Sequence, residues 1–194
     1  CGSGRRSHFG GVGLRISKCR EPRMEIRYCF TPPDETSEAV LDQISDLVAS
    51  SGGVGTSWIK ENLQKAFLIG YALCEDRVVG TSTHKYPKEH YRKKIEAETG
   101  LDLSNYLERG YTAVDPEFQG MGIGGKVIQG LIERSEGQEI YVTIDMDNPW
   151  PLRMTHRVGM GFAARFINDR TGHELGVFTN VTPCRNVLNP AKDC

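Results

Sequence analysis

The stretch from Gln119 to Lys126, QGMGIGGK, constrains the fold more than any other part of this chain. It follows a run of β-branched and aromatic residues typical of a strand, and it precedes apolar residues at helical spacing between Val127 and Ile132. A glycine-rich turn between a strand and a helix presents main-chain N–H groups and the positive end of the helix dipole to an anion. Glycine suits such a turn because it has no Cβ to block a ligand. We therefore predict that this turn binds a phosphate group.

Two nucleotide-binding patterns also have to be considered for this turn. Gly120 to Lys126 matches the triphosphatase pattern G-x-x-x-x-G-K-[ST] except at the last position, where Val127 cannot coordinate Mg²⁺. The dinucleotide pattern G-x-G-x-x-G also matches, and Asp145 lies 20 residues beyond Gly125. However, several residues separate the predicted strand from the first glycine, and too little chain follows Asp145 for a doubly wound sheet. Both patterns are therefore weaker alternatives.

A third pattern, Q/R-x-x-G-x-G/A, is complete at Gln119, Gly122 and Gly124. The wider segment YTAVDPEFQGMGIG, residues 111–124, resembles the strand, bulge and loop of the GNAT acyltransferases, including their V-x-P-x-x-Q/R spacing. Downstream, residues 142–148 resemble the next strand of that family with its terminal asparagine. We therefore predict membership of the GNAT superfamily.

The order of predicted elements agrees with this resemblance, which extends from Met24 to Asn180. Alternating or β-branched segments predict strands at 24–30, 66–74, 77–83, 107–114, 139–146, 162–168 and 173–179. Helices are predicted around 40–48, in 58–66, after the glycine turn and in 151–158, and the charged segment 85–104 is expected to form a solvated helix and loop. This order predicts an α/β fold with one mixed sheet flanked by helices. The GNAT resemblance implies that the parallel strands of this sheet splay apart.

Carried over by position, the resemblance implies how acetyl-CoA would bind. The pantetheine arm would enter the split between the parallel strands and hydrogen-bond to the main chain at Thr112, Ala113 and Val114. The N–H of Val114 would polarise the thioester carbonyl as an oxyanion-hole donor. Asn148 would meet the pantetheine or the adenosine. The residues of the turn that would hold the pyrophosphate are Gln119, Gly120, Met121, Gly122, Ile123, Gly124, Gly125 and Lys126.

The resemblance also implies which residues act on the amine and on the thiol. Glu108 occupies the early strand position where several GNAT enzymes carry a glutamate base, which a protonated amine requires at neutral pH. The alternative is a strand-edge carboxylate that pairs with Arg109 or with the charged segment 85–104. Where the family has a tyrosine that donates to the departing thiolate, this chain aligns Thr155, or Arg157 if the alignment slips by two residues. The identity of the general acid is therefore left open.

Charge and cysteine usage limit the other function classes. Residues 1–23 carry six basic residues against one acidic residue, and we interpret them as a disordered tail, tag or leader rather than an arm for nucleic acid or membrane. A short tail is expected at 181–194. No apolar run is long enough to span a membrane. The six cysteines lack zinc-site spacing, so we expect reduced thiols, no metal and a cytoplasmic protein.

We therefore predict that residues 24–180 form an acetyl-CoA-dependent N-acyltransferase. It would transfer an acetyl or short acyl group to a primary amine of a small molecule or peptide by direct attack. The net negative charge outside the basic segment favours a cationic acceptor. The alternative is a GNAT-like domain that senses acyl-CoA without turnover, since the tyrosine is missing. We expect no nucleic acid or membrane partner, and the frequent dimers of the family leave a homodimer open.

Overall fold

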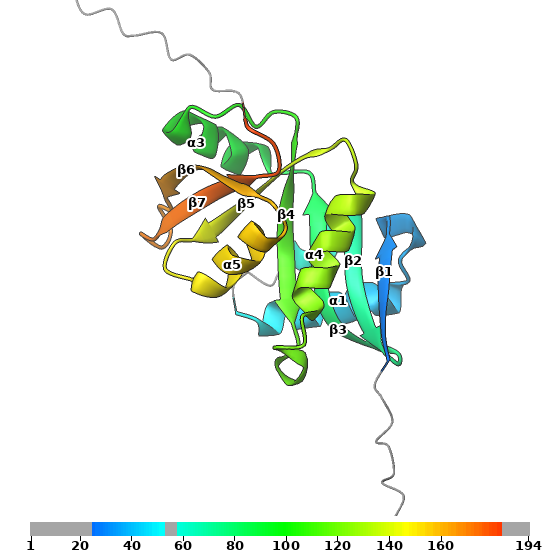
Figure 1. Cartoon of the computed structure of the whole chain (residues 1–194). Helices are drawn as coiled ribbons and strands as arrows, with labels where there is room; N and C mark the ends of the chain where they lie inside the picture. The colour runs from blue at the N-terminus through cyan, green and yellow to red at the C-terminus, as the bar shows by residue number, and fades with distance from the viewer. Residues whose placement is uncertain (1–24, 53–57, 184–194) are drawn as a thin grey trace, which may run out of the picture.

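The computed structural model describes residues 25–52 and 58–183, so the predicted tail at 1–23 and residues 184–194 lie outside the described part. The described chain forms a seven-stranded sheet with helices on both faces (Figure 1). The strands are β1 (Ile26–Thr31), β2 (Ala66–Cys74), β3 (Arg77–Lys85), β4 (Tyr106–Val114), β5 (Glu139–Asp145), β6 (Gly161–Ile167) and β7 (Glu174–Thr179). The helices are α1 (Glu38–Ser50), α2 (Ile59–Leu63), α3 (Glu89–Thr99), α4 (Ile123–Arg134) and α5 (Pro149–Arg157). The predicted α/β fold is confirmed.

The sheet is mixed, as predicted. Its strand order is β1-β2-β3-β4-β5-β7-β6. Every pair of neighbours is antiparallel except β4 and β5, which are parallel and are joined by the crossover helix α4. The predicted hairpin of β2 and β3 is also present, and Glu75 adopts a positive φ of 55° in its turn.

The helices divide between the two faces of the sheet. One face is covered by α1 and α2, whose core residues include Leu41, Ile44 and Ile59. The opposite face is covered by α4, which packs through Val127 and Leu131. Figure 1 shows α4 in front of the sheet, α1 behind it, and α5 beside β5 on the side of α4. Helix α4 and helix α5, which connects β5 to β6, therefore lie on the same face of the sheet.

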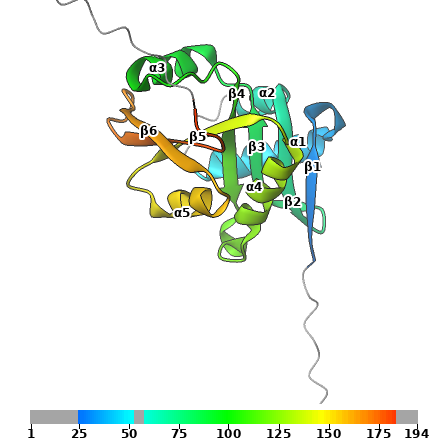
Figure 2. The same cartoon turned by 45° about the horizontal axis from the view of Figure 1, so that its top comes forward.

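The charged segment before β4 is less solvated than predicted. Helix α3 and the loop after it bury Ile95, Leu101 and Leu103 completely, in a cluster with Tyr141 and Phe166 of the sheet. Figure 2 shows α3 at the end of the molecule nearest β6. The three buried residues are too few to outweigh the surrounding charges in a sequence pattern, yet they are enough to fix the segment on the sheet.

Candidate active site

β4 and β5 pair over a short stretch and then separate. Their register runs from Tyr106 opposite Glu139 to Glu108 opposite Tyr141, and the remaining residues of these two described strands are not paired with each other. Figure 1 shows β5 turning away from β4. A cavity of about 320 Å³ opens where they part. Its lining residues are Arg109, Gly110, Thr112, Ile128, Val142, Thr143, Ile144, Asp145, Trp150, Pro151 and Met154. The predicted splay of the parallel strands is therefore present.

A β-bulge bends β4 beside this cavity. Thr81 of β3 lies opposite Ala113, and Thr83 lies opposite Gly110, so β4 contains one more residue than β3 between these pairs. Tyr111 lies in the bulge with a φ of 48°, a value that is uncommon for a residue with a side chain. Bulges of this kind re-aim the main chain of one strand. Here the bulge turns β4 away from β5.

The predicted pantetheine contacts follow the bulge. Thr112 lines the cavity, and Ala113 is buried. The amide of Asp115 donates to the carbonyl oxygen of Val79 in β3 at 3.0 Å. Successive residues of a strand direct their N–H groups to opposite sides, so the amide of Val114 points away from β3, toward the side of β4 on which β5 has separated. That direction is the one required of the predicted oxyanion-hole donor.

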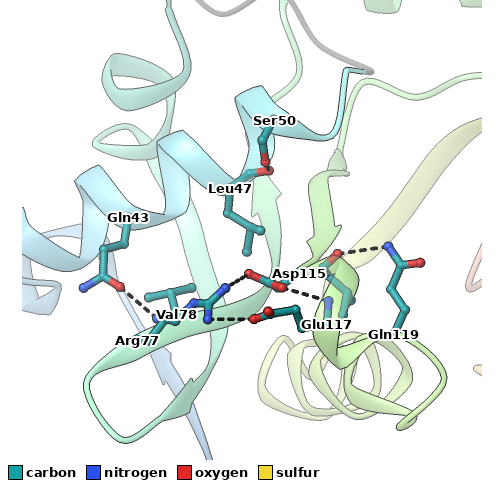
Figure 3. A network of polar contacts seen from close by, with 9 residues as sticks. Gln43, Leu47, Ser50, Arg77, Val78, Asp115, Glu117 and Gln119 are labelled. Carbon is teal, nitrogen blue, oxygen red and sulfur yellow. Dashed lines mark hydrogen bonds and ion pairs between the residues drawn. The ribbon is translucent and has the colours of Figure 1, made fainter.

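A polar network holds the start of the glycine turn (Figure 3). The Arg77 guanidinium binds the carboxylates of Asp115 and Glu117, the latter at 3.0 Å. Asp115 also accepts a hydrogen bond from the amide of Glu117 at 3.0 Å and so caps a short 3-10 turn. The side chain of Gln119 donates to the carbonyl oxygen of Val114 at 3.3 Å. Gln119 therefore ties the turn to the end of β4 through its side chain.

The first turn of α4 offers uncapped amides. Its N-cap is Gly122, which has no side chain to cap the helix and whose φ of 76° would strain any other residue. The N–H groups from Ile123 to Gly125 have no acceptor within the helix, and the helix dipole adds positive potential there. Gly120 also has a positive φ, and Met121 is 52% exposed. In the turn, the residues from Gln119 to Gly122 are exposed, whereas Ile123 and Gly124 are buried.

A second opening, of about 380 Å³, lies between α4 and α5 beside this turn. Its lining residues are Gly122, Gly125, Lys126, Gln129, Met154, Arg157 and Val158. Lys126 and Arg157 place two positive charges there, and the Lys126 ammonium also lies 5.5 Å from the centre of the Tyr28 ring. Asn148 is the exposed N-cap of α5, and its side chain makes no capping hydrogen bond. The opening therefore has two basic residues among its lining residues and shares Gly122 and Gly125 with the predicted phosphate site.

Arg109 is a functional candidate that the sequence interpretation missed. The residue is 5% exposed, and its guanidinium donates to the Thr155 hydroxyl at 2.6 Å and contacts the Met160 sulfur at 3.1 Å. Within the described residues no carboxylate pairs with it, and its Nε atom has no hydrogen-bond partner. Burial lowers the pKa of Arg109 from 12.5 to about 10, so the group remains charged at neutral pH. A buried, unpaired cation at a cavity wall is typical of a site that receives an anion.

Thr155 faces the interior of the molecule. It is fully buried on α5, and its hydroxyl accepts the hydrogen bond from Arg109. Arg157, which the slipped alignment would have placed there, is exposed and lines the outer opening instead. Arg157 therefore does not line the cavity in the split.

Glu108 lies on the opposite face of the sheet from Arg109, because consecutive residues of a strand point to opposite sides. Its carboxylate pairs with Lys85 at 2.5 Å, and both side chains are less than 15% exposed (14% for Lys85 and 13% for Glu108). The alternative pairing with Arg109 is therefore wrong, and pairing with the charged segment 85–104 is observed. Both side chains line a cavity of about 510 Å³. Gly110 lines this cavity and also the one in the split, so a residue without a side chain borders both cavities near the point where β4 and β5 part.

Three further observations concern metals, thiols and membranes. Within 25–52 and 58–183, no cluster of three or more His, Cys, Asp or Glu side chains could hold a metal ion. Of the six cysteines, the structure describes Cys29 and Cys74, which are both free thiols. Among the described helices, none has both the length and the apolar character needed to cross a bilayer.

The splayed strands and the glycine turn together form the site expected of an acyl-CoA-dependent transferase. The model of the acetyltransferase (GNAT) family matches residues 24–162 of the sequence. The chain therefore belongs to the GNAT acetyltransferase family. No curated protein sequence matches it.

Solved structures share the fold at low sequence identity. A protein of Bordetella pertussis assigned to the GNAT acetyltransferases is 19% identical, with a TM-score of 0.61 over 80% of this chain and 96% of that one. NAA60 of Arabidopsis thaliana, solved with acetyl-CoA, is 13% identical, with a TM-score of 0.60 over 79% of this chain and 98% of that one. An acyl-CoA N-acyltransferase of Pseudomonas aeruginosa is 10% identical, with a TM-score of 0.60 over 81% of this chain and 100% of that one. These similarities show the fold alone.

Proposed function

We propose that the protein is an acetyl-CoA-dependent N-acetyltransferase in which an amine attacks the thioester directly. The observation that carries this proposal is that Gly110 borders two cavities, one in the split of the sheet and one beside Glu108. A donor in the first and an acceptor in the second would bring the thioester carbon and the amine nitrogen together. Such positioning supplies a large part of the rate enhancement of a group transfer.

The donor side of the site is built mainly from main-chain groups. The uncapped amides of α4 and the cations Lys126 and Arg157 would hold the diphosphate. The pantetheine arm would lie along β4 from Thr112 to Val114, with the amide of Val114 directed at the thioester carbonyl. NAA60 of Arabidopsis was solved with acetyl-CoA and also with a bisubstrate analogue, which supports acetyl-CoA as the donor.

On the acceptor side, Glu108 would take the proton of the amine, directly or through one water molecule. Lys85 fixes the carboxylate at the cavity wall. As the new C–N bond forms, the C–S bond breaks and the electron pair leaves on the thiolate. Arg109 would stabilise that thiolate with a charge-assisted hydrogen bond, and Thr155 would orient the guanidinium.

A domain that senses acyl-CoA without turnover is the competing proposal, because Thr155 stands where the family has a tyrosine. Arg109 supplies a hydrogen-bond donor at that position, which supports turnover. Acetyl-CoA incubated with a panel of primary amines should release free thiol in proportion to the amine acetylated. Tight binding of acetyl-CoA without thiol release from any amine would instead support the sensor.

The assignment of the turn is tested by a matched pair of variants. Gly122 and Gly137 have φ values of 76° and 79°, and an added Cβ at either meets no atom within 4 Å. Gly122→Trp and Gly137→Trp should therefore strain the chain equally, but only Gly122→Trp should lose affinity for coenzyme A in titration calorimetry. Equal affinity in the two variants would mean that the turn does not hold the diphosphate.

A further inference from the structure

The cavity beside Glu108 has an excess of positive charge. Its charged lining residues are Lys85, Lys88, Lys94, Arg170, Glu108 and Asp169. Lys85 pairs with Glu108, and Lys94 pairs with Asp169 and with Glu98 outside the cavity. In the part of the chain that the structure describes, neither Lys88 nor Arg170 forms an ion pair. Two cationic groups of the wall therefore have no carboxylate to neutralise them.

These two cations come from different elements and share one cavity with Glu108. Lys88 is the N-cap residue of α3, which begins without a side-chain cap, so the positive end of that helix adds to the local potential. Arg170 lies in the turn between β6 and β7. Glu108 lines the same cavity from β4, next to Gly110 and the split. The cavity thus offers a carboxylate for an amine near the split and free cations elsewhere on its wall.

We infer that the acceptor is a small primary amine that also carries an anionic group, either a carboxylate or a phosphate. This inference rests on the proposed function and names its substrate class. The anionic group binds Lys88 and Arg170 while the amine approaches Glu108, and a cavity of about 510 Å³ accommodates a small molecule. Charges more than about 8 Å away are largely screened at physiological salt, so the local excess outweighs the negative net charge of the chain. This inference differs from the sequence-based expectation of a cationic acceptor.

The inference is tested first with amines of similar size and different charge. β-Alanine and 2-aminoethyl phosphate carry an anion, 2-aminoethanol and propylamine are neutral apart from the amine, and 1,3-diaminopropane carries a second cation. With saturating acetyl-CoA, thiol release should give a kcat/KM at least about tenfold higher for the anionic amines, the scale of one charge-assisted hydrogen bond. Comparing the first two compounds separates carboxylate from phosphate. If kcat/KM for the neutral amines equals kcat/KM for the anionic amines, the inference is overturned.

Charge-removing variants test the two cations directly. Lys88→Gln and Arg170→Gln should each raise KM for the preferred anionic amine while leaving kcat/KM for propylamine unchanged. Arg165→Gln is the matched control, because Arg165 is an exposed cation on the adjacent strand β6 that does not line the cavity. A loss of the same size for all amines would show that the two cations support the structure rather than the acceptor.

A binding readout distinguishes failure of this inference from failure of the proposed function. Titration calorimetry of β-alanine and propylamine into protein saturated with coenzyme A measures preference without turnover. If no amine releases thiol but β-alanine still binds more tightly in a manner that depends on Arg170, the proposed function fails and the anion site stands. If both amines bind equally, the inference fails whatever the turnover.

Discussion

Arg109→Met should remove the buried charge while keeping an unbranched side chain of similar length. The lowering of the Arg109 pKa from 12.5 to about 10 corresponds to about 3 kcal/mol of unfavourable burial, at about 1.4 kcal/mol for each pKa unit. The hydrogen bond to Thr155 offsets part of this unfavourable free energy, since a net contribution of about 1 kcal/mol is typical for one hydrogen bond. The variant should therefore unfold with a free energy equal to that of the parent or up to about 2 kcal/mol higher.

The same substitution should lower kcat, although it leaves the stability equal or higher. A hydrogen bond to a charged group is worth about 1.5–3 kcal/mol, so its loss at the departing thiolate should lower kcat about ten- to a hundredfold. KM for acetyl-CoA should change little, because in the proposed site the turn, and not Arg109, holds the diphosphate. Thiol release at saturating acetyl-CoA measures kcat, and urea denaturation of the same samples measures the free energy of unfolding. Arg109→Lys, which keeps a cation, should recover part of the rate.

The control is Arg27→Met, at an exposed arginine of the edge strand β1, which should alter neither quantity. Two outcomes would contradict the argument for Arg109. A kcat equal to that of the parent would show that the guanidinium does not act on the leaving group. A free energy of unfolding lower by about 2 kcal/mol or more, with activity falling in step, would show that Arg109 holds the fold instead.

Two further predictions concern stability alone. Burial, with a smaller effect from the charge of Arg109, lowers the pKa of His84 from 6.5 to about 3, so between these pH values the unfolded chain binds a proton that the folded chain does not. The stability advantage of the parent over His84→Gln in urea denaturation should therefore shrink by about 2 kcal/mol between pH 6.5 and 5, and parallel pH profiles would contradict this. A Cβ at Gly130 would lie 2.2 Å from the Phe30 ring, which the Arg134 guanidinium covers at 4.2 Å, so Gly130→Ala should cost about 1–3 kcal/mol despite its better helix propensity. Unchanged stability would show that the ring can move.

The donor half of the site could be predicted from the sequence because it depends on the main chain. A glycine turn between a strand and a helix positions amides wherever it occurs, and the pattern at Gln119, Gly122 and Gly124 identified it. Asp115, two residues before Glu117, also signals the short capped turn that the structure contains. These features are local in sequence, and therefore a single sequence suffices to find them.

The proposed acceptor half could not be predicted because its residues meet only through tertiary structure. Lys88 and Arg170 are separated by most of the second half of the chain, and no spacing rule connects them. The burial of Ile95, Leu101 and Leu103 could not be predicted either, because most of the sheet residues that they pack against are distant in sequence. Arg109 is different, since strand alternation alone places it and Glu108 on opposite faces and so excludes their pairing. That inference was available from the sequence, and it would have left Arg109 in need of another partner.

The register of β4 determines which chemistry each face of the sheet receives. Glu108 faces the proposed acceptor cavity and Arg109 faces the proposed donor cavity because they are neighbours on one strand. A shift of one residue would exchange the carboxylate and the guanidinium, leaving a cation beside the amine and an anion beside the departing thiolate. The extra residue of the bulge at Tyr111 lies just after this pair, so it bends the strand without altering the pairing of Arg109 with His84. The bulge can therefore open the split for the donor while the order of charges across the sheet is preserved.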